Sequence, residues 1–343
     1  MCAGHVNSFV DFFYLTHRPE DDTSHEIHLD QLPYVKEFLC TAEAAHRKGD
    51  SPREYEAYKK LADYFQEITA FKTAVYFYEK CLEIAETMED SRRQCIANLN
   101  LGVAHDKLKE TVKAIGFHER HLAIAQRTGD EQARTSANRH LLDVYRTLGE
   151  QHEAKGELDA ALVCHRKCLE AATQIDDQRA EGLAYHKLAL ASVKRGQVDA
   201  AIEHAKSYLA ICKQSGDQIG EGAACSALAQ CYQATKRVDL AVQYLEAFLE
   251  IASRHQQLQQ QAEACCQLGT IYAANENHEK AVEYFEKNYE LARSTGQRAL
   301  IDAARINLGT AKGKLLTGKF MNVVQDDMAA LLKWKSKRIA FGK

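Results

Sequence analysis

The stretch QLGTIYAANENHEKAVEYF, residues 267–285, is the clearest copy of a unit that repeats along this chain of 343 residues. The leucine of the unit recurs at steps of 40, 40, 47, 40, 40 and 40 residues, at Leu61, Leu101, Leu141, Leu188, Leu228, Leu268 and Leu308. A period of this length marks a stacked array of one supersecondary unit. Each unit buries its apolar face only against its neighbours, so the chain is predicted to be an all-α solenoid with a long exposed groove. Such a shape favours holding partners over catalysis.

Each unit reads as two amphipathic helices. In the fifth unit, residues 223–235 place apolar side chains such as Leu228 and Cys231 on one side of a helix, and residues 240–253 repeat the pattern. An alanine marks the same place in every second helix, at Ala74, Ala114, Ala161, Ala201, Ala241 and Ala281. Polar stops such as Gly129-Asp130 separate the units, because glycine can end a helix and aspartate can cap the next one.

A small residue follows most of the leucines, where two helices should cross closely, at Ala62, Gly102, Ala189, Ala229, Gly269 and Gly309. Leu142 breaks this rule in the third unit, which also carries seven extra residues around residues 147–153. Seven residues are about two helical turns, so the insertion is expected to lengthen the helix pair while keeping its face. The helices there should protrude, or the superhelix should bend. A simple loop is the alternative, although the stretch lacks the usual punctuation of loops.

Three segments are predicted, at residues 1–52, 53–312 and 313–343. The first is an N-terminal extension that is irregular over residues 1–28 and forms a degenerate helix over residues 29–48. The second is the repeat array of about six helix pairs. The third contains a helix at residues 320–332 and a basic tail, and we interpret this helix as a cap on the last repeat.

The charge of the chain is balanced except at its end. The formal net charge is −4, so no basic excess indicates nucleic-acid binding. The tail from Lys333 to Lys343 carries five basic residues and no acidic one. A solvated helix end is one interpretation of the tail. The other is a contact with an acidic surface such as a filament, made by Lys333, Trp334, Lys335, Lys337 and Arg338.

The cysteines and the N-terminus indicate a soluble, intracellular protein. There are eleven cysteines and no CxxC pair, and Cys81, Cys168, Cys225 and Cys265 fall at small-residue positions of the repeat. Buried apolar packing explains these thiols better than disulfides or metal. An odd count without a signal peptide indicates a reducing compartment. The apolar run within residues 1–19 is too short to span a membrane.

The unit resembles the tetratricopeptide repeat, with its Leu-Gly, tyrosine, alanine and aromatic pattern over roughly residues 54–312. The resemblance implies a right-handed superhelix that binds proteins without catalysis. The units depart from the standard 34-residue repeat because each is about 40 residues long and lacks the usual proline. This longer variety is similar to the repeats of the LGN-type spindle-orientation adaptors, especially at residues 217–225. No motif of the Gly-Leu-regulatory class follows the repeats.

The end of the chain resembles a second group of proteins. Residues 305–309 (RINLG), 322–324 (NVV) and 331–335 (LLKWK) are similar to the C-terminus of the tetratricopeptide repeat protein 29 family. That family is ciliary. The resemblance implies an axonemal component of the cilium or flagellum, part of a large complex with inner-arm dynein subunits and neighbouring doublet-microtubule proteins.

Groove residues are expected on the first helix of each unit, which lines the inner side of the array in this family. Positions three before and one after the small residue give the candidates Lys59, Asp63, Arg139, Asp143, His186, Ser226 and Gln230, and Arg146 and Gln233 lie one turn further. We predict that these side chains bind a partner segment, with Arg139, Asp143 and Arg146 binding its charged groups. Solvated helix faces are the alternative. The carboxylate clamp for chaperone C-termini is not reproduced.

No metal, cofactor or catalytic site is expected. The runs HERH at residues 118–121 and CHRKC at residues 164–168 have spacings that can place two metal ligands on one helix face. His118 and His165, however, occupy the position of Tyr78 in the first unit, so we interpret them as packed side chains. The chain has no GxxxxGK[ST], GxSxG or HExxH motif. The glycines at residues 216–222 follow no predicted strand and make a weak phosphate loop.

Two functions remain open from the sequence. One is a structural axonemal scaffold that helps to seat or regulate dynein arms. The other is a soluble adaptor, either for ciliary cargo transport or for spindle-orientation machinery. Neither function involves nucleic acid or membrane.

Overall fold

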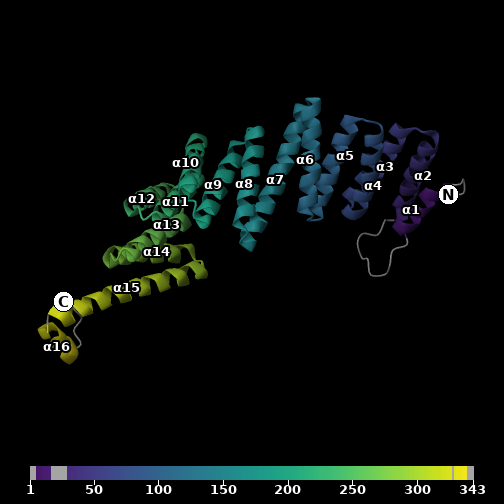
Figure 1. Cartoon of the computed structure of the whole chain (residues 1–343). Coiled ribbons are helices and arrows are strands. Elements are labelled where there is room, and N and C mark those ends of the chain that lie inside the picture. Colours follow the sequence, from purple (N-terminus) through teal and green to yellow (C-terminus); the bar gives the residue numbers. More distant parts are fainter. Residues whose placement is uncertain (1–4, 17–28, 327, 338–343) are drawn as a thin grey trace. The chain divides into compact units, whose positions relative to one another are not determined.

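The computed structural model describes residues 5–16, 29–326 and 328–337 of the chain, which divides into two compact units between Ala180 and Glu181. We call these the N-terminal unit and the C-terminal unit. The N-terminal unit contains α1 (Val6–Thr16), the 3₁₀ turn η1 (Leu29–Gln31), α2 (Leu32–Lys48), α3 (Ser51–Glu67), α4 (Phe71–Thr87), α5 (Ser91–Lys107), α6 (Thr111–Thr128), α7 (Glu131–Lys155) and α8 (Leu158–Gln174). Figure 1 shows α3 to α8 side by side in chain order.

The C-terminal unit continues the same alternation of first and second helices. It contains α9 (Gln178–Arg195), which begins at the boundary, α10 (Val198–Ser215), α11 (Gln218–Ala234), α12 (Val238–Arg254), α13 (Leu258–Ala274), α14 (His278–Thr295), α15 (Arg298–Asp326) and α16 (Met328–Lys337). All regular elements among the described residues are helices. The predicted all-α solenoid of helix pairs is therefore confirmed.

The polar stops between units work as capping pairs. Gly49, Gly129 and Gly216 end their helices in the left-handed conformation, with φ of 69°, 69° and 70°. The aspartate that follows then accepts a backbone N–H of the next helix, as Asp130 does from Ala133 at 2.9 Å and Asp217 from Gly220 at 3.0 Å. The Gly-Asp pairs thus set where each repeat begins.

The small residue of the repeat lets the two helices of a pair cross closely. A Cβ atom on Gly269 would lie 2.8 Å from the Phe285 ring, and one on Gly102 would overlap the His118 ring. The filling side chain comes sixteen residues later in both pairs. His118 is buried, with 1% of its surface exposed, and Phe285 is 4% exposed. The prediction of close crossing at these positions is confirmed.

The seven-residue insertion lies entirely within α7. This helix has 25 residues, whereas its partner α8 has 17, like α4 and α12. The loop alternative is wrong, and lengthening of the whole pair holds only for the first helix. Two added turns return to nearly the same face, because seven residues turn an α-helix through almost 720°.

The small residue of the third pair is Gly149, which corrects the assignment of Leu142 to that position. A Cβ atom on Gly149 would lie 2.6 Å from Cε1 of His165, sixteen residues later. Leu142 is buried instead against Ala171 and Ala172 of α8. Leu141 keeps the register counted from the start of α7, and the Leu148-Gly149 pair restores it towards α8.

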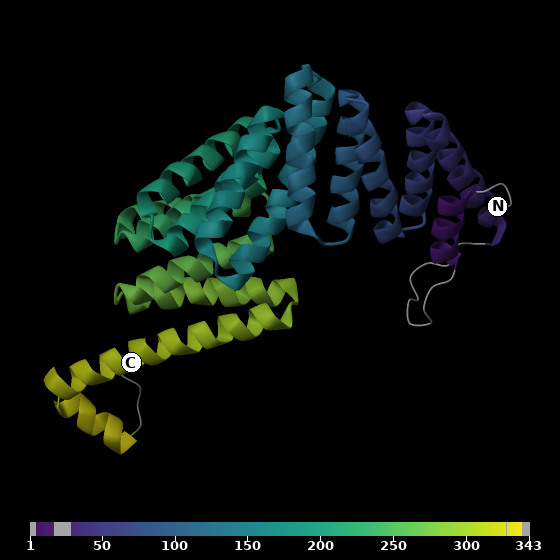
Figure 2. The same ribbon diagram turned by 45° about the vertical axis from the view of Figure 1, so that its right-hand side comes forward.

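Both ends of the chain differ from expectation. Residues 6–16 form helix α1, where an irregular segment was predicted. The predicted separate helix at residues 320–332 is wrong, because α15 runs through to Asp326 and α16 follows it. Figure 2 shows α15 continuing past α14, with α16 turned back beside its end. The Phe320 and Trp334 rings meet there with centroids 5.4 Å apart.

The first half of α15 closes the array with a polar face. Relative to α13, forty residues earlier, Asp302 replaces Ala262, Arg305 replaces Cys265 and Lys312 replaces Tyr272. Ala304 and Ala311 of α15 are buried. Charged side chains on the other side of α15 remove the need for a covering second helix, which is the role of a cap.

Candidate functional site

The candidate site is the exposed side of the first helices. We define the groove face as the positions three before, one after and four after the small residue in α3, α5, α7, α9, α11, α13 and α15. In α7, the two added turns extend the groove face towards both registers. The two units are described separately because the same positions carry different chemistry in each.

In α3 the predicted residues Lys59 and Asp63 pair with each other. Lys59 Nζ lies 2.8 Å from Asp63 Oδ2, and the Tyr78 hydroxyl donates to Asp63 Oδ1 at 2.7 Å. The hydrogen bond to Asp63 raises the pKa of Lys59. Both oxygens of Asp63 therefore have partners inside the repeat, and this pair is held more firmly than a solvated helix face.

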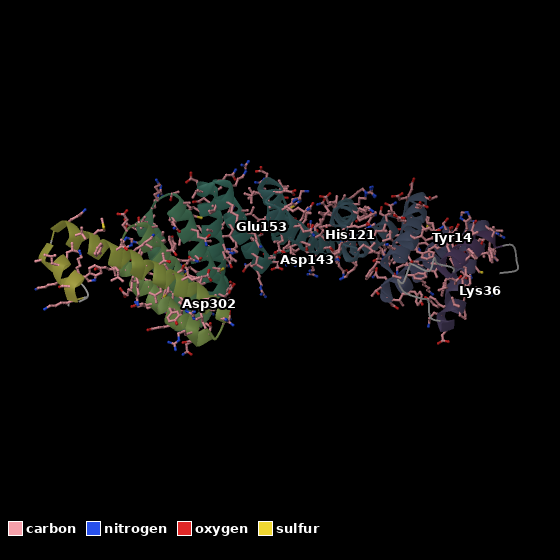
Figure 3. The ribbon with its side chains drawn as sticks, turned by 90° about the horizontal axis from the view of Figure 1, so that it is seen from below. Tyr14, Lys36, His121, Asp143, Glu153 and Asp302 are labelled. Carbon is pink, nitrogen blue, oxygen red and sulfur yellow. The ribbon has the colours of Figure 1, made fainter. Side chains whose placement is uncertain are left out.

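In α7 the predicted residues belong to a longer charged stripe. Arg139, Asp143 and Arg146 are exposed, and Arg146 Nη2 lies 2.8 Å from Asp143 Oδ1. Glu150 and Glu153 continue the same face at the spacings of four and three residues that keep side chains aligned on a helix. Figure 3 labels Asp143 and Glu153 on this helix. We call these five residues the α7 stripe.

Glu150 and Glu153 were missed from the sequence. They stand one and four residues after Gly149, so they occupy the groove face in the register of α8. The signal was the second leucine-glycine pair at residues 148–149, which repeats the dipeptide of the second and sixth units. Glu153 also reaches inward, with Oε1 3.0 Å from Nε2 of the buried His165.

Between α3 and α7, the groove face of α5 is apolar. Leu99 and Val103 are partly exposed there. A cleft of about 540 Å³ opens between α5, α6 and α7, lined by Leu99, Cys95 and Ser136 among others. His121, 2% exposed, lies at this cleft, and its Nδ1 has no hydrogen-bond partner among the described residues. The N-terminal unit thus combines charged helices with an apolar cleft between them.

The groove face of the C-terminal unit carries no ionic group. Gln230 and Gln233 are exposed on α11, while His186 packs on Tyr208 with ring centroids 4.9 Å apart. Ser226 is buried and exchanges hydrogen bonds with Gln267 of α13, at 3.0 and 3.1 Å. The remaining positions are apolar, small or hydroxyl-bearing, namely Leu190, Val193, Cys266, Thr270, Ala273, Ile306, Thr310 and Gly313.

A second cleft lies in the C-terminal unit at the register of the α5–α6–α7 cleft. It has a volume of about 250 Å³ between α13, α14 and α15. Asn288 takes the place of His121 there and donates to the Ala262 carbonyl at 2.6 Å. This cleft is about half the size of its counterpart, and Cys266 and Asn307 replace Leu99 and His140 at its mouth.

The predicted tail residues lie on α16. Lys333, Lys335 and Lys337 are exposed, and Trp334 is partly buried against Phe320. Arg338 lies outside the described residues. The contact of this helix with a filament stays a prediction.

The histidine-rich runs are packed, as the sequence indicated. His118 is stacked on His140 with ring centroids 4.9 Å apart, and neither ring nitrogen of His118 has a hydrogen-bond partner among the described residues. Burial is the main cause that lowers the pKa of His118 to about 3 and that of His121 to about 4. Among the described residues, no group of three or more His, Cys, Asp or Glu side chains is placed to hold a metal ion.

The cysteines act as small core residues. Cys81, Cys168, Cys225 and Cys265 are buried and unpaired. Burial raises the pKa of Cys225 and of Cys265 to about 11, so neither thiol ionises readily near neutral pH. None of the described helices has both the length and the apolar character that crossing a bilayer requires.

Comparisons with known proteins address the repeat family. Sequence models of the tetratricopeptide repeat match residues 98–132, 224–259 and 262–295. These segments cover α5–α6, α11–α12 and α13–α14, three of the six helix pairs. The models describe a repeat and not a catalytic domain. No curated protein matches the chain.

Several solved structures have a similar fold. A signal transduction ATPase with a tetratricopeptide repeat sensor, from Pyrococcus horikoshii, is 19% identical with a TM-score of 0.46, over 87% of this chain and 47% of that chain. The present chain thus spans about half the length of that protein. A putative kinesin light chain with TPR-like repeats, from Podosopora anserina, is 21% identical with a TM-score of 0.42, over 61% of this chain and 98% of that one. YrrB, a TPR protein described as having an unusual peptide-binding site, is 21% identical with a TM-score of 0.41, over 66% and 97% of the two chains.

The repeat family follows from the matched segments and the common register of the remaining pairs. The leucine, the small residue and the alanine marker recur in the helix pairs that the models do not match, and the structure places them at equivalent crossings. The chain is a tetratricopeptide repeat protein.

Proposed function

We propose that this protein is a non-enzymatic scaffold that holds a partner protein on the groove face of its N-terminal unit. The observation that carries the proposal is the α7 stripe, five ionic side chains on one face of the longest helix in that unit. Tetratricopeptide repeats are protein-binding units, and ionic side chains at groove positions select partners by charge. An uncharged groove face, as in the C-terminal unit, offers hydrogen bonds but no selection by charge.

The α7 stripe is available to a partner. The Arg146–Asp143 pair is about half exposed on both sides, and exposed ion pairs contribute only about 0–1 kcal/mol. A partner carboxylate can therefore replace Asp143 on Arg146 at little cost. Arg139 stands two turns before Arg146, so two acidic groups about 10 Å apart would meet both guanidinium groups.

The apolar cleft beside the stripe supplies a second type of contact. Neighbouring first helices lie about 10 Å apart, so a partner segment that crosses α7 also reaches α5. The α5–α6–α7 cleft of about 540 Å³ is large enough for a bulky apolar side chain. We therefore propose a partner segment with acidic groups and one large apolar residue.

Charge reversal tests this proposal. In quantitative pull-down from cells that express the tagged chain, Arg139→Glu with Arg146→Glu should reduce the amount of bound partner by about tenfold. The matched control is Lys206→Glu with Arg254→Glu, because both residues are exposed and pair with a glutamate on their own helix. Unchanged capture by the α7 variant would refute the proposed site.

We further propose that the partners are axonemal, with inner-arm dynein subunits and neighbouring doublet-microtubule proteins among them, and that the protein serves ciliary or flagellar motility. The support is the resemblance of residues 305–309, 322–324 and 331–335 to a ciliary family. The exposed lysines of α16 offer a basic surface for an acidic filament. A soluble adaptor for ciliary cargo or for spindle orientation is the alternative, supported by the similarity of residues 217–225 to the LGN-type repeats.

Fractionation of ciliated cells separates the two. A structural axonemal component should stay with axonemes after detergent and after high salt, with dynein heavy chains among its crosslinked neighbours. Release of the tagged protein by mild detergent would refute the axonemal proposal and favour the adaptor.

A further inference from the structure

Helix α1 carries an apolar stripe on its solvent-facing side. Val6, Phe9, Val10, Phe13 and Tyr14 are 65%, 55%, 42%, 44% and 70% exposed. Their spacing of i, i+3, i+4, i+7 and i+8 aligns them along one face of the helix. Peripheral helices normally bury such a face against the core. The only fully buried residue of α1 is a serine, Ser8.

The opposite side of α1 is anchored by polar contacts that fix its rotation. The Ser8 backbone N–H and hydroxyl donate to Glu43 Oε2 at 2.8 and 2.6 Å, and the hydroxyl also lies 2.8 Å from the Leu39 carbonyl oxygen. One turn later, Asp11 accepts from the Tyr76 hydroxyl at 2.9 Å. These bonds attach α1 to α2 and α4 and leave its apolar stripe facing outward.

The anchor at Glu43 is built to hold a charge. Glu43 is 5% exposed, and its second oxygen pairs with Arg47. The hydrogen bonds from Ser8 and Arg47 outweigh burial and lower the pKa of Glu43 to about 2. A buried carboxylate needs such donors, so the contact with Ser8 fixes α1 in one orientation. The outward display of the stripe is thus a defined feature of the N-terminal unit.

The neighbouring sequence supplies little to cover the stripe. Between Thr16 and Leu29, Ile27 is the one large aliphatic residue in a run that is mostly polar and charged. Exposed apolar patches of this kind mark sites of protein or membrane contact. Tyr14 is labelled in Figure 3.

Charge and area select the type of partner. Asp11 is the only ionic residue of α1, whereas helices that lie on membranes carry Lys and Arg beside the apolar face. A second copy is too small a partner. Three half-exposed aromatic side chains of about 150–250 Å² and two valines give on the order of 400–500 Å², against roughly 800 Å² per partner in a stable interface. A groove that encloses the helix also covers its flanks.

We propose that α1 is a docking helix, presented by the repeat array to a partner protein with an apolar groove about 16 Å long, the length of eleven helical residues. Phe9 and Phe13 are the central anchors. This site is separate from the groove face and does not depend on the function proposed above.

Crosslinking followed by reconstitution tests the proposal. A photoreactive benzophenone side chain is placed at Tyr14 of the full chain, and at Val112 of α6 as the control, because Val112 is 75% exposed outside the stripe. A protein captured from position 14 and not from position 112 is then purified, and its affinity for the intact chain is measured by calorimetry. Phe9→Glu with Phe13→Glu should weaken binding by about tenfold or more. Val112→Glu with Val163→Glu should leave it unchanged.

Three results would overturn the docking helix. One is equal affinity for the wild-type chain and the Phe9→Glu, Phe13→Glu variant, or no capture specific to position 14. The second is a dimer of the purified chain, seen by light scattering, that this variant converts to a monomer, because the stripe would then face a second copy. The third is co-sedimentation with phosphatidylcholine–phosphatidylserine vesicles that the variant abolishes. Equal melting temperatures of variant and wild type establish that the fold is intact.

Discussion

The two units share one architecture and differ in the chemistry that they present on it. In the N-terminal unit, the groove face carries Lys59 and Asp63 on α3 and the ionic α7 stripe, whereas in the C-terminal unit the same positions carry Gln230, Gln233 and uncharged residues. The repeat needs its leucine, its small residue and its alanine for packing. The groove positions make no such demand, so they are free to specify partners.

The same contrast holds inside the repeats. The residue that fills the crossing is His118 in the second pair and Phe285 in the sixth. Phenylalanine satisfies the site with apolar contact alone, whereas a buried imidazole brings two nitrogens that have no partner among the described residues. The N-terminal unit therefore tolerates polar groups in its core at some cost in stability.

The largest expected effect concerns the crossing itself. Gly102→Ala should destabilise the protein by about 1–3 kcal/mol, because the new methyl group would overlap the buried His118 ring. Gly309→Ala is the matched control in α15, where nothing lies within 4 Å of the added Cβ. It should be neutral or stabilise by up to about 1 kcal/mol through helix propensity. Urea unfolding followed by circular dichroism measures both, and equal effects would contradict the close crossing.

The next effect is the pH dependence of the histidine site. The pKa of His118 is about 3 in the folded protein and about 6.5 when unfolded, so its neutral form stabilises the fold fully above pH 6.5. As pH falls below 6.5 the unfolded chain takes up the proton first, and stability is lost towards pH 3. At pH 5 the loss is about 2 kcal/mol from this residue.

Exchange of the two filling residues sharpens that comparison. His118→Phe should reduce the loss of stability between pH 7 and pH 5, measured by urea unfolding at both values. Phe285→His should introduce such a loss in the C-terminal unit. If both variants keep the pH dependence of the wild type, burial of His118 is not its source.

A smaller effect is expected at the Lys59–Asp63 pair. Tyr78→Phe removes the 2.7 Å hydrogen bond to Asp63 and should cost about 1 kcal/mol, as for a typical hydrogen bond. A double-mutant cycle with Asp63→Ala isolates the interaction, and a coupling energy near zero would show that the bond contributes nothing.

The sequence predicted the array well because its markers are packing residues. Leu61 and its counterparts, the glycines beside them and the Gly-Asp stops all act within one or two helices, so their spacing alone indicates the fold. The third pair was misassigned because Leu141-Leu142 keeps the register from the start of α7, while Leu148-Gly149 keeps it towards α8. Two full helical turns separate them, so both alignments place a leucine on the same face.

The candidate site was predicted only in part. Arg139, Asp143 and Arg146 were identified, but their continuation to Glu150 and Glu153 follows from the corrected register. Helix α1 was missed because its apolar residues do not face the array, and its anchor joins Ser8 to Glu43, 35 residues away. A short-range pattern cannot reveal a contact of that kind.

The most direct test of the central claim compares the two groove faces in one binding experiment. Partner capture is measured for the wild type, for Arg139→Glu with Arg146→Glu, and for Gln230→Glu with Gln233→Glu, at about 50 and about 300 mM salt. We predict that the first variant loses about tenfold in binding, that the second binds like the wild type, and that salt weakens wild-type binding. Wild-type capture by the Arg139→Glu, Arg146→Glu variant, or a loss confined to the glutamine variant, would contradict the assignment of the N-terminal unit as the partner-selecting surface.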